Sequence, residues 1–490
     1  KYPQYEKIYA TLGYSKLIID EVQAYDPKAC AIVVKMIEDI VSLGGRFLLM
    51  TATLPTFVKN YLKEKEIIKD EDIINFYECK LEIEIKTTSK HKIELRQKDI
   101  IEDIVEIIKK AKDGNRILVV LNTIEKAEEV YDKIEKKIAN DKSDIFLRLI
   151  HSRFTLNQRR EKEKEIEEKF KNPKPKEEKE AKIFVATQVV EASLDIDADY
   201  LFTEIAPMDS LIQRMGRVMR RVKYYEEYEQ KEKNVFVYVC LKEDKNRFYI
   251  ESGKGNVYEN DILFLTFCVI LNLILKENEK LKEVLRLFEN SDEIEQQKEK
   301  QKTIKNLKEL IKDLMKNISE IKIEIPLMEK DKNKIVEEVY NYKKFKYLTK
   351  SNYFKKFNQT LSILDSGYVS ENKEEAHKLF REIYTISLVG EEKVKEIKDK
   401  IQKEINKKKD ITWLWFKKEI IAEYVINDNM WKYREYELKP LGEKLCEMLD
   451  ISEEIKRYCE GIWVVKKKSL KETPEESDIE TIADSKGVIL

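Results

Sequence analysis

Apolar and polar positions alternate with two different periods from the first residues to about residue 240. Stretches such as Ile32–Val41, Ile101–Ala111 and Ile124–Ile138 place apolar residues three or four positions apart, which is typical of amphipathic helices. Short apolar runs separate these stretches and are typical of buried strands. The runs are Leu17–Ile19, Phe47–Met50, Ile117–Leu121, Phe146–Ile150, Ile183–Ala186, Tyr200–Phe202 and Val235–Cys240. Strands that alternate with helices predict α/β domains built on parallel sheets.

The pattern divides the chain into three parts. Residues 1–90 hold two strand–helix units, and residues 93–242 hold about five strands with intervening helices, enough for a complete small domain. Residues 243–490 change to long Lys- and Glu-rich helices, with strand-like runs such as Trp431–Leu438 and Ile462–Val465. We therefore expect an incomplete α/β domain, a complete α/β domain, and a mainly helical C-terminal domain with some strands.

Composition narrows the class of protein without identifying it. Charged residues reach 38%, but 93 Lys and Arg balance 94 Asp and Glu, so the basic excess of an electrostatic nucleic-acid binder is missing from the total. Local geometry can still concentrate positive charge, and nucleic acid is therefore not excluded. Six cysteines without CxxC spacing and only three histidines argue against a zinc site, a disulfide framework or a multi-histidine metal centre. Reduced thiols predict a cytoplasmic protein.

Two further stretches predict particular local structures. Ile262–Leu275 is the most apolar stretch, but it is too short to span a bilayer and predicts a buried helix, with no membrane as a partner. Arg159–Lys182 is a run of charges interrupted by Pro173 and Pro175. This run predicts a solvated helix followed by a mobile loop.

The first pattern with chemical content is the pair Asp20 and Glu21, directly after the apolar run Leu17–Ile19. Ligands of parallel sheets bind at the carboxyl ends of the strands. One carboxylate there can hold Mg²⁺, and its neighbour can orient an attacking water for phosphoryl transfer. Two adjacent acids are also ordinary in a loop before a helix, so this pair alone does not decide between the two interpretations.

Two more patterns follow strand-like runs. Thr51-Ala52-Thr53 comes after Phe47–Met50, where its hydroxyls can bond a neighbouring acidic loop or merely form a turn and cap a helix. The stretch TQVVEASLD (residues 187–195) comes after Ile183–Ala186 and again places polar groups at a strand tip.

The fourth pattern is QRMGRVMR, residues 213–220. On a helix, Arg217 and Arg220 would share a face, and Gln213 would lie one turn before Arg217. Two guanidinium groups on one face, with Gly216 allowing close approach, predict an anionic ligand. A solvated basic helix is the alternative interpretation.

All four patterns occur in one order, each at the end of a strand or on the helix that follows it. In this order they resemble the superfamily 2 DExD/H-box helicases. More closely, they resemble the CRISPR-associated helicase–nuclease that the Cascade surveillance complex recruits in type I CRISPR systems. The closer resemblance covers about residues 10–240 and rests on Asp20–Asp26, His151–Phe154, Thr187–Glu191 with Asp195, and Gln213–Arg220. It implies tandem RecA-like domains that close on ATP, the first of them incomplete here.

The resemblance assigns roles in ATP hydrolysis to five residues. Asp20 would hold Mg²⁺, and Glu21 would orient the attacking water. Arg217 and Arg220 would reach the phosphates as arginine fingers, with Gln213 positioning phosphate or water. Gln23 and Gly216 would lie near the nucleotide, and Asp195 would lie close to the nucleotide or to the domain interface.

It also assigns residues to coupling and to nucleic acid. Thr51 and Thr53 would couple the nucleotide state to strand movement. The residues along the single-stranded DNA path would be His151, Ser152, Arg153, Thr187, Gln188 and Glu191. A histidine that follows a strand is just as often structural, so His151 keeps both interpretations.

Two departures from the family pattern matter. Gln23 stands where the family usually has His, which changes a coupling group but not the two acids. The sequence contains no Gly-x-x-x-x-Gly-Lys-Ser/Thr, and Gly253-Lys254-Gly255 lacks both the earlier Gly and the following Ser or Thr. The histidine-rich HD nuclease of the family is missing as well. We therefore expect a fragment or one half of a split protein, inactive as an ATPase alone, whose first strands present bare apolar faces.

The leading hypothesis is an ATP-dependent helicase that translocates on single-stranded DNA in CRISPR interference. Its partners would be DNA, Cascade with its crRNA, and an upstream nuclease and RecA-like segment. The alternatives are another superfamily 2 helicase acting on DNA or RNA, and a DNA-binding or docking module with an incomplete motor. A smaller hypothesis is a strand-binding surface at Trp431–Arg434, with a β-strand core as its alternative.

Overall fold

The structure is a computed structural model in which part of the chain is described. The described residues are 5–22, 25–51, 54–74, 88–175, 177–191, 194–222, 228–244, 247–251, 257–258, 260–274, 324–327, 352–365, 385–407, 409–429, 433 and 436–465. Packing groups residues 1–107 with 197–379, and residues 108–196 with 380–490. The domain boundaries expected near residues 90 and 242 stay a prediction.

The N-terminal strands form a parallel pair that is covered on one face. In β1 and β2, Ile18 lies opposite Leu48 and Ile19 opposite Leu49. Ile19 is buried in an apolar cluster with α2 and α3, whereas Ile18 and Leu48 on the other face are 61% and 52% exposed. The expected bare apolar face is therefore confirmed. The elements are α1 (Tyr5–Leu12), β1 (Lys16–Asp20), α2 (Pro27–Ser42), β2 (Arg46–Met50) and α3 (Thr56–Glu64).

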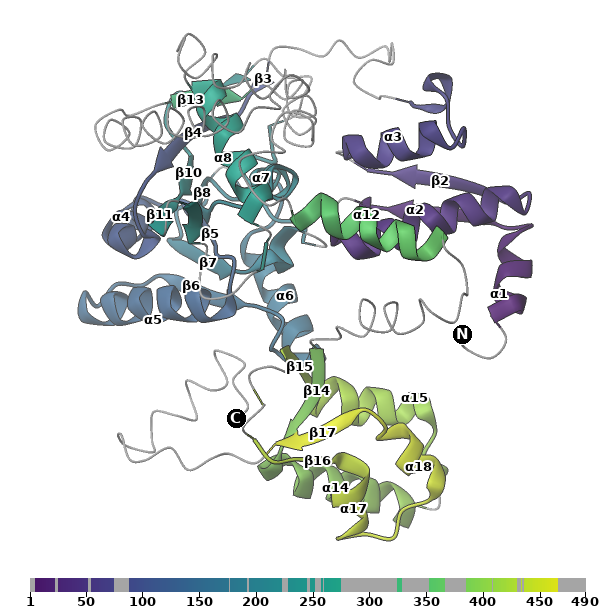
Figure 1. The fold of residues 1–490 in the computed structure, drawn as a ribbon. Helices are drawn as coiled ribbons and strands as arrows, with labels where there is room; N and C mark the ends of the chain where they lie inside the picture. The colour runs from purple at the N-terminus through teal and green to yellow at the C-terminus, as the bar shows by residue number, and fades with distance from the viewer. Residues whose placement is uncertain are drawn as a thin grey trace. The chain divides into compact units, whose positions relative to one another are not determined.

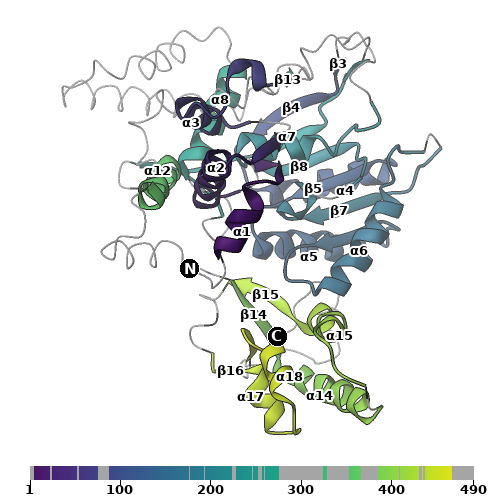
Figure 2. The same ribbon diagram turned by 90° about the vertical axis from the view of Figure 1, so that its right-hand side faces the viewer.

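A helix from far along the chain packs on this pair of strands. In α12 (Asn352–Asp365), Phe357 meets Phe57 edge to face at 4.8 Å between ring centroids. Lys35 of α2 forms an ion pair with Asp365 at 2.8 Å. Both views show α12 beside α2 (Figures 1 and 2). The apolar core of the N-terminal part is thus built by two distant segments, the elements β1 to α3 and the helix α12.

The second α/β part is built on a seven-stranded sheet with the order β13-β4-β10-β8-β5-β7-β6. β10 pairs in parallel with both β4 and β8, and β7 pairs in parallel with both β5 and β6. Only β13 is antiparallel to its partner, β4. The strands are β4 (His91–Arg96), β5 (Arg116–Val120), β6 (Phe146–Ile150), β7 (Lys182–Ala186), β8 (Tyr200–Glu204), β10 (Val235–Tyr238) and β13 (Glu324–Leu327).

This sheet confirms the parallel α/β fold class. Every residue of β5 and β7 is buried, as expected for strands covered on both faces, and both strands are rich in Val and Ile. All seven expected strand runs coincide with observed strands, whereas β4, which buries every second residue, lies outside them. The helices around the sheet are η3 (Ile100–Asp103), α4 (Ile104–Lys112), α5 (Ile124–Asn140), α6 (Leu156–Lys169), η4 (Gln188–Glu191) and α7 (Met208–Met215).

Side-chain caps fix where two of the helices begin. Asp26 accepts hydrogen bonds from the amides of Lys28 and Ala29 at 2.8 and 3.1 Å, directly before α2. Thr155 and Gln158 form a reciprocal capping box at the start of α6. Such caps satisfy amides that have no partner in the first helical turn.

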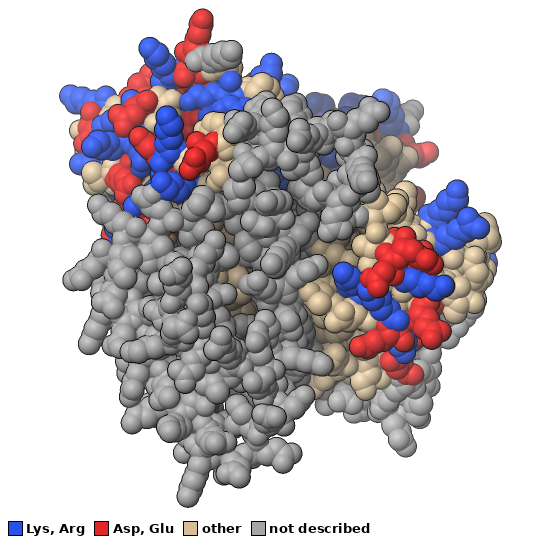
Figure 3. Space-filling model, turned by 90° about the horizontal axis from the view of Figure 1, so that it is seen from above, with Lys and Arg blue, Asp and Glu red and all other residues tan. Residues whose placement is uncertain are grey.

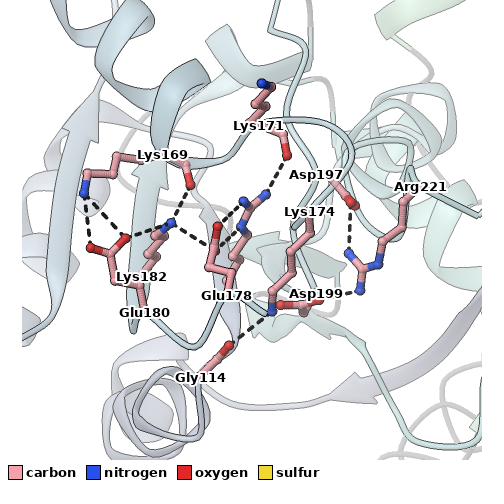
Figure 4. A network of polar contacts seen from close by, with 11 residues as sticks. Gly114, Lys169, Lys171, Lys174, Glu178, Glu180, Lys182, Asp197, Asp199 and Arg221 are labelled. Atoms are coloured by element: carbon pink, nitrogen blue, oxygen red, sulfur yellow. Dashed lines mark hydrogen bonds and ion pairs between the residues drawn. The ribbon is translucent and has the colours of Figure 1, made fainter. Parts of the chain in front are cut away.

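The charged loop after α6 is anchored, and the expectation of a mobile loop was wrong for its second half. Arg116 is fully buried at the start of β5 and forms two hydrogen bonds with Glu178, each at 2.6 Å. Lys182, with 3% of its side chain exposed, contacts Glu178 at 2.9 Å and Glu180 at 3.0 Å (Figure 4). Burial opposes the charge of Glu178, but hydrogen bonds from Arg116 and Lys182 outweigh it and lower the pKa of Glu178 to about 2. Composition alone could not predict this, because it does not show which charges a sheet edge will bury.

The described part of the C-terminal region is a small mixed α/β domain. Its sheet has the order β15-β14-β17-β16, and only β14 and β17 are parallel. A cluster that includes Ile397, Phe416 and Leu445 fills its core. The strands are β14 (Thr385–Gly390), β15 (Ile426–Asn429), β16 (Leu438–Pro440) and β17 (Ile462–Val465). The helices are α14 (Glu391–Asn406), α15 (Trp413–Phe416), η8 (Lys417–Ile421), α16 (Ala422–Tyr424), α17 (Leu441–Cys446) and α18 (Glu453–Tyr458).

Several expectations about the later part of the chain can be compared with this structure. The strand expected at Ile462–Val465 is β17, and the helix expected at Ile262–Leu275 is α8 (Asn260–Ile274). Within the described ranges, no helix is both long enough and apolar enough to cross a membrane. Of the residues in the Trp431–Arg434 hypothesis, only Tyr433 is described, and the other three lie outside the described residues. Tyr433 is buried, and its hydroxyl donates a hydrogen bond to Asp428 at 2.9 Å.

Candidate nucleotide and nucleic-acid site

The carboxyl ends of β1 and β2 bring three of the predicted residues to one sheet edge. Asp20 ends β1 opposite Met50, and the amide of Glu21 donates to the carbonyl of Met50 at 2.9 Å. Thr51 follows Met50 directly. Both acids are exposed, and Glu21 has a φ of 53°, in the left-handed region that is costly for a residue with a side chain. Two of the predicted residues at this edge, Gln23 and Thr53, lie outside the described residues.

This edge fits Mg²⁺ through a small number of carboxylate ligands. Mg²⁺ keeps several waters and is usually held by one or two carboxylates together with substrate phosphates. Asp20, at the end of β1, supplies one exposed carboxylate that could serve as such a ligand. Within the described residues, no three His, Cys, Asp or Glu side chains gather to enclose a metal by themselves.

The carboxyl ends of β6 and β7 form a second edge. The amide of Thr187, just after β7, donates to the carbonyl of Ile150 at 3.3 Å, which joins the loops after the two strands. Gln188 begins η4, and its Nε2 donates to the carbonyl of Asn122 at 2.7 Å. Thr187 is buried and Glu191 is half-buried. The amide of Thr187 and the side chain of Gln188 therefore hold these loops together.

His151 and Arg153 at the same edge are held inside the protein. The buried His151 ring stacks on Phe154 with 4.5 Å between centroids, and its Nδ1 accepts from the amide of Arg153 at 3.2 Å. Arg153, with 12% of its side chain exposed, reaches Glu125 at 2.6 Å and Asp428 at 3.0 Å. This geometry favours the structural interpretation of His151. A DNA phosphate would have to displace these carboxylates to reach Arg153, whereas Ser152 between the two is exposed.

The basic pattern after β8 departs from the expected helix. α7 ends at Met215, with Gly216 as its C-cap, so Arg217 and Arg220 do not share a helical face. Val218 instead forms a parallel bridge with Ala198. A pattern of spacings could not anticipate this, since the bridge partner comes from another segment. Gly216 keeps a right-handed conformation (φ −61°, ψ −11°), and a Cβ at this position would lie 3.2 Å from the carbonyl oxygen of Gln213. Arg217, Arg220 and Gln213 are all half-buried.

Two arginines that the sequence pattern did not single out are held in place by several contacts. Arg214 is fully buried and donates to Thr203 Oγ1 at 2.8 Å and to Tyr258 at 3.2 Å. Arg221 forms ion pairs with Asp197 at 3.0 Å and Asp199 at 2.5 Å. The doubled arginine at 220–221 and the alternate acids at 195, 197 and 199 were the available signal. Asp195 itself is exposed and accepts from Asn172 at 3.0 Å.

Charge on the molecular surface agrees with the balanced total. On the face drawn in Figure 3, basic side chains of the described residues lie among acidic ones.

Parallel sheets with polar groups at their carboxyl ends, followed by an arginine-rich segment, agree with the architecture that the helicase resemblance implies. The family described as "CRISPR-associated nuclease/helicase Cas3, C-terminal" matches residues 113–223. The CRISPR-associated endonuclease/helicase Cas3 of Escherichia coli K12 is 31% identical over 235 residues, which cover 44% of this chain and 26% of that protein. Over these stretches the chain is similar to the Cas3 nuclease/helicases, and the predicted resemblance is confirmed.

Solved structures agree on the fold. T. fusca Cas3 with ADP has a TM-score of 0.58 at 16% identity, covering 94% of this chain and 52% of that one. A chain in the structure described as "CRISPR RNA-guided surveillance complex, pre-nicking" has a TM-score of 0.54 at 15% identity, covering 92% and 53%. The chain thus spans about half the length of these solved proteins, and its matches cover about a quarter of the curated relatives.

Proposed function

We propose that this chain forms part of an ATP-dependent helicase that translocates on single-stranded DNA in CRISPR interference. The observation that carries the proposal is the placement of the helicase patterns. Asp20, Glu21 and Thr51 share one carboxyl edge, and the stretches after β6 and β7 share another. Ligands of parallel sheets bind at such edges.

The roles of this chain's residues follow from those positions. Bound Mg²⁺ would neutralise charge on the transferring phosphates. Asp20 would hold that ion, and Glu21 would orient the attacking water through an exposed carboxylate. Arg217 and Arg220 would stabilise the charge that develops on the phosphates, with Gln213 positioning a phosphate or water. A Gly-rich phosphate-binding loop would be contributed by an upstream segment, in the same or another chain.

Partners are proposed on the same basis. Single-stranded DNA would pass the loops after β6 and β7, near Ser152 and Gln188. The likeness to a chain in a CRISPR RNA-guided surveillance complex supports docking to Cascade with its crRNA. A protein that acts on DNA with such a complex would work in the cytoplasm, where we place it.

Hydrolysis by the protein joined to its upstream segment tests the proposal. Arg217→Ala should lower DNA-stimulated ATP turnover by about 10³–10⁵-fold, because arginine fingers act on transition-state charge. Nucleotide affinity, measured by equilibrium binding, should stay close to that of the parent protein. Arg160→Ala on the exposed face of α6 is the matched control and should keep full turnover.

Three results would count against the proposal. A loss of turnover that is matched by an equal loss of ATP affinity would show that Arg217 contributes to binding alone. A parent protein that hydrolyses no ATP with single-stranded DNA, even with the upstream segment present, would favour a docking module instead. RNA in place of DNA as the better activator would favour another superfamily 2 helicase.

A further inference from the structure

The segment after α7 is held against the loop before β8 by backbone contacts. The amide of Ala198 donates to the carbonyl of Arg217 at 2.9 Å, and the amide of Met219 donates to the carbonyl of Ala198 at 2.9 Å. On the other side, buried His91 of β4 donates through Nε2 to the carbonyl of Val218 at 3.0 Å. The segment 217–220 is therefore fixed through its main chain on both sides.

Met219 shows that the segment is under local strain. Its φ is 50°, a left-handed value that is unfavourable for a residue with a side chain. Such a conformation persists only where surrounding contacts impose it. It turns the chain between Arg217 and Arg220, the two residues proposed to meet phosphate.

Asp197 connects this strained turn to a third arginine. Its side chain is fully buried, and its Oδ1 accepts from the amide of Arg220 at 2.9 Å. Its Oδ2 accepts from Arg221 Nη1 at 3.0 Å, while Arg221 Nη2 reaches Asp199 at 2.5 Å. Figure 4 shows the guanidinium of Arg221 between the two carboxylates. Arg221 thus supplies a charged partner to this buried carboxylate and, through the same carboxylate, is linked to the amide of Arg220.

We propose that Arg221 is a positioning residue that acts through Asp197 to hold Arg217 and Arg220 in the geometry required for hydrolysis. The proposal rests on the proposed ATPase function. Misplacing a reacting group by about 1 Å can lower a rate by about 10²-fold, so the contact would affect turnover without touching the nucleotide. Lys at position 221 supplies one charge but cannot bridge both carboxylates, because a lysine has no planar fork of donors.

Two measurements on the protein joined to its upstream segment test this role. In Arg221→Met, kcat for ATP with single-stranded DNA should fall by about 10²-fold while KM for ATP stays within a few-fold of the parent value. Arg221→Lys should recover part of that loss. Hydrogen exchange at the amides of residues 219 and 220, measured by mass spectrometry, should be at least tenfold faster in Arg221→Met. Arg148→Met, which breaks a half-exposed pair with Glu165, is the matched control and should change neither quantity.

The exchange measurement separates this proposal from the proposed function. Parent-like exchange at residues 219 and 220 in Arg221→Met would overturn the positioning role, whether or not the protein is an ATPase. A proportional rise in KM with unchanged kcat would also overturn it. If the parent protein lacks ATPase activity, the proposed function fails, and the exchange data still decide whether Arg221 orders the segment. A general loss of protection in Arg221→Met, also present in Arg221→Lys, would assign the pair to folding alone and refute the proposal.

Discussion

Replacing Glu178 by Gln should destabilise the sheet around β5 and β7 at neutral pH. The change keeps a hydrogen-bonding side chain of similar size but removes the charge that Arg116 and Lys182 face. Those two cations are 0% and 3% exposed, so neither can turn to water for compensation. Removing one partner of a buried ion pair typically costs about 3–5 kcal/mol.

The pKa of Glu178 gives an independent magnitude. Its fall from 4.5 to about 2 corresponds to about 3 kcal/mol, at about 1.4 kcal/mol for each pKa unit. Because the folded pKa lies below the unfolded one, this stabilisation is fully present above about pH 4.5 and is lost as the pH falls towards 2. The gap in stability between the parent protein and Glu178→Gln should therefore be constant near neutral pH and narrow below about pH 4.5.

Hydrogen exchange resolved by peptide is the suitable assay, because a multidomain chain has no single unfolding free energy. Peptides covering β5 and β7 should exchange roughly 150-fold faster in Glu178→Gln, since about 1.4 kcal/mol is a factor of ten. The matched control is Glu180→Gln, whose 54% exposed side chain also contacts Lys182. Half-exposed pairs contribute about 0–1 kcal/mol, so exchange there should change less than about fivefold. Equal effects of the two variants would refute the reasoning that burial of Arg116 and Lys182 sets the magnitude.

Two further changes test contacts between distant segments. Asp428→Asn removes the charge that the nearly buried Arg153 faces at 3.0 Å. The loss of a charged hydrogen bond costs about 1.5–3 kcal/mol, so peptides from both β6 and β15 should exchange about 10-fold faster or more. Loss of protection in β15 alone would contradict the idea that this contact stabilises both segments. Phe357→Ala removes a side chain that is 4% exposed and should destabilise α2 by about 3–5 kcal/mol, measured as faster exchange in α2. Gln359→Ala, at an exposed position of the same helix, should have little effect. Unchanged protection of α2 in Phe357→Ala would rule out a shared core.

The parallel strands could be predicted from the sequence because buried strands appear as runs of consecutive apolar residues. β5 and β7 are buried on both faces, so every position in them is apolar or paired, and the runs stand out. β4 escaped the prediction because its polar residues alternate with buried ones, and buried His91 reads as polar in a sequence. Exposed polar positions at strand tips, such as Asp20, were also readable, because a strand followed by an acid is a local pattern.

What the sequence could not provide were contacts made across long separations. The segment 217–220 leaves the helix because Ala198 supplies a bridge, and no local spacing contains that information. Arg153 looked available for DNA because its carboxylate partner Asp428 lies 275 positions away (428 − 153). Arg221 was passed over for the same reason, since its role depends on where Asp197 lies in space.

The packing of α12 on α2 has a consequence for the order in which the protein is made. Residues 43–351 separate the end of α2 from the start of α12, a stretch of 309 residues (351 − 43 + 1). At about 5–20 residues per second, a ribosome needs roughly 15–60 s to synthesise that stretch. Throughout that interval the positions that Phe357 and Leu361 later cover on the N-terminal helices have no partner from α12. The helices α2 and α3 are thus synthesised well before α12 and complete their core late. A chaperone that binds apolar segments would have the longest time to bind at α2 and α3.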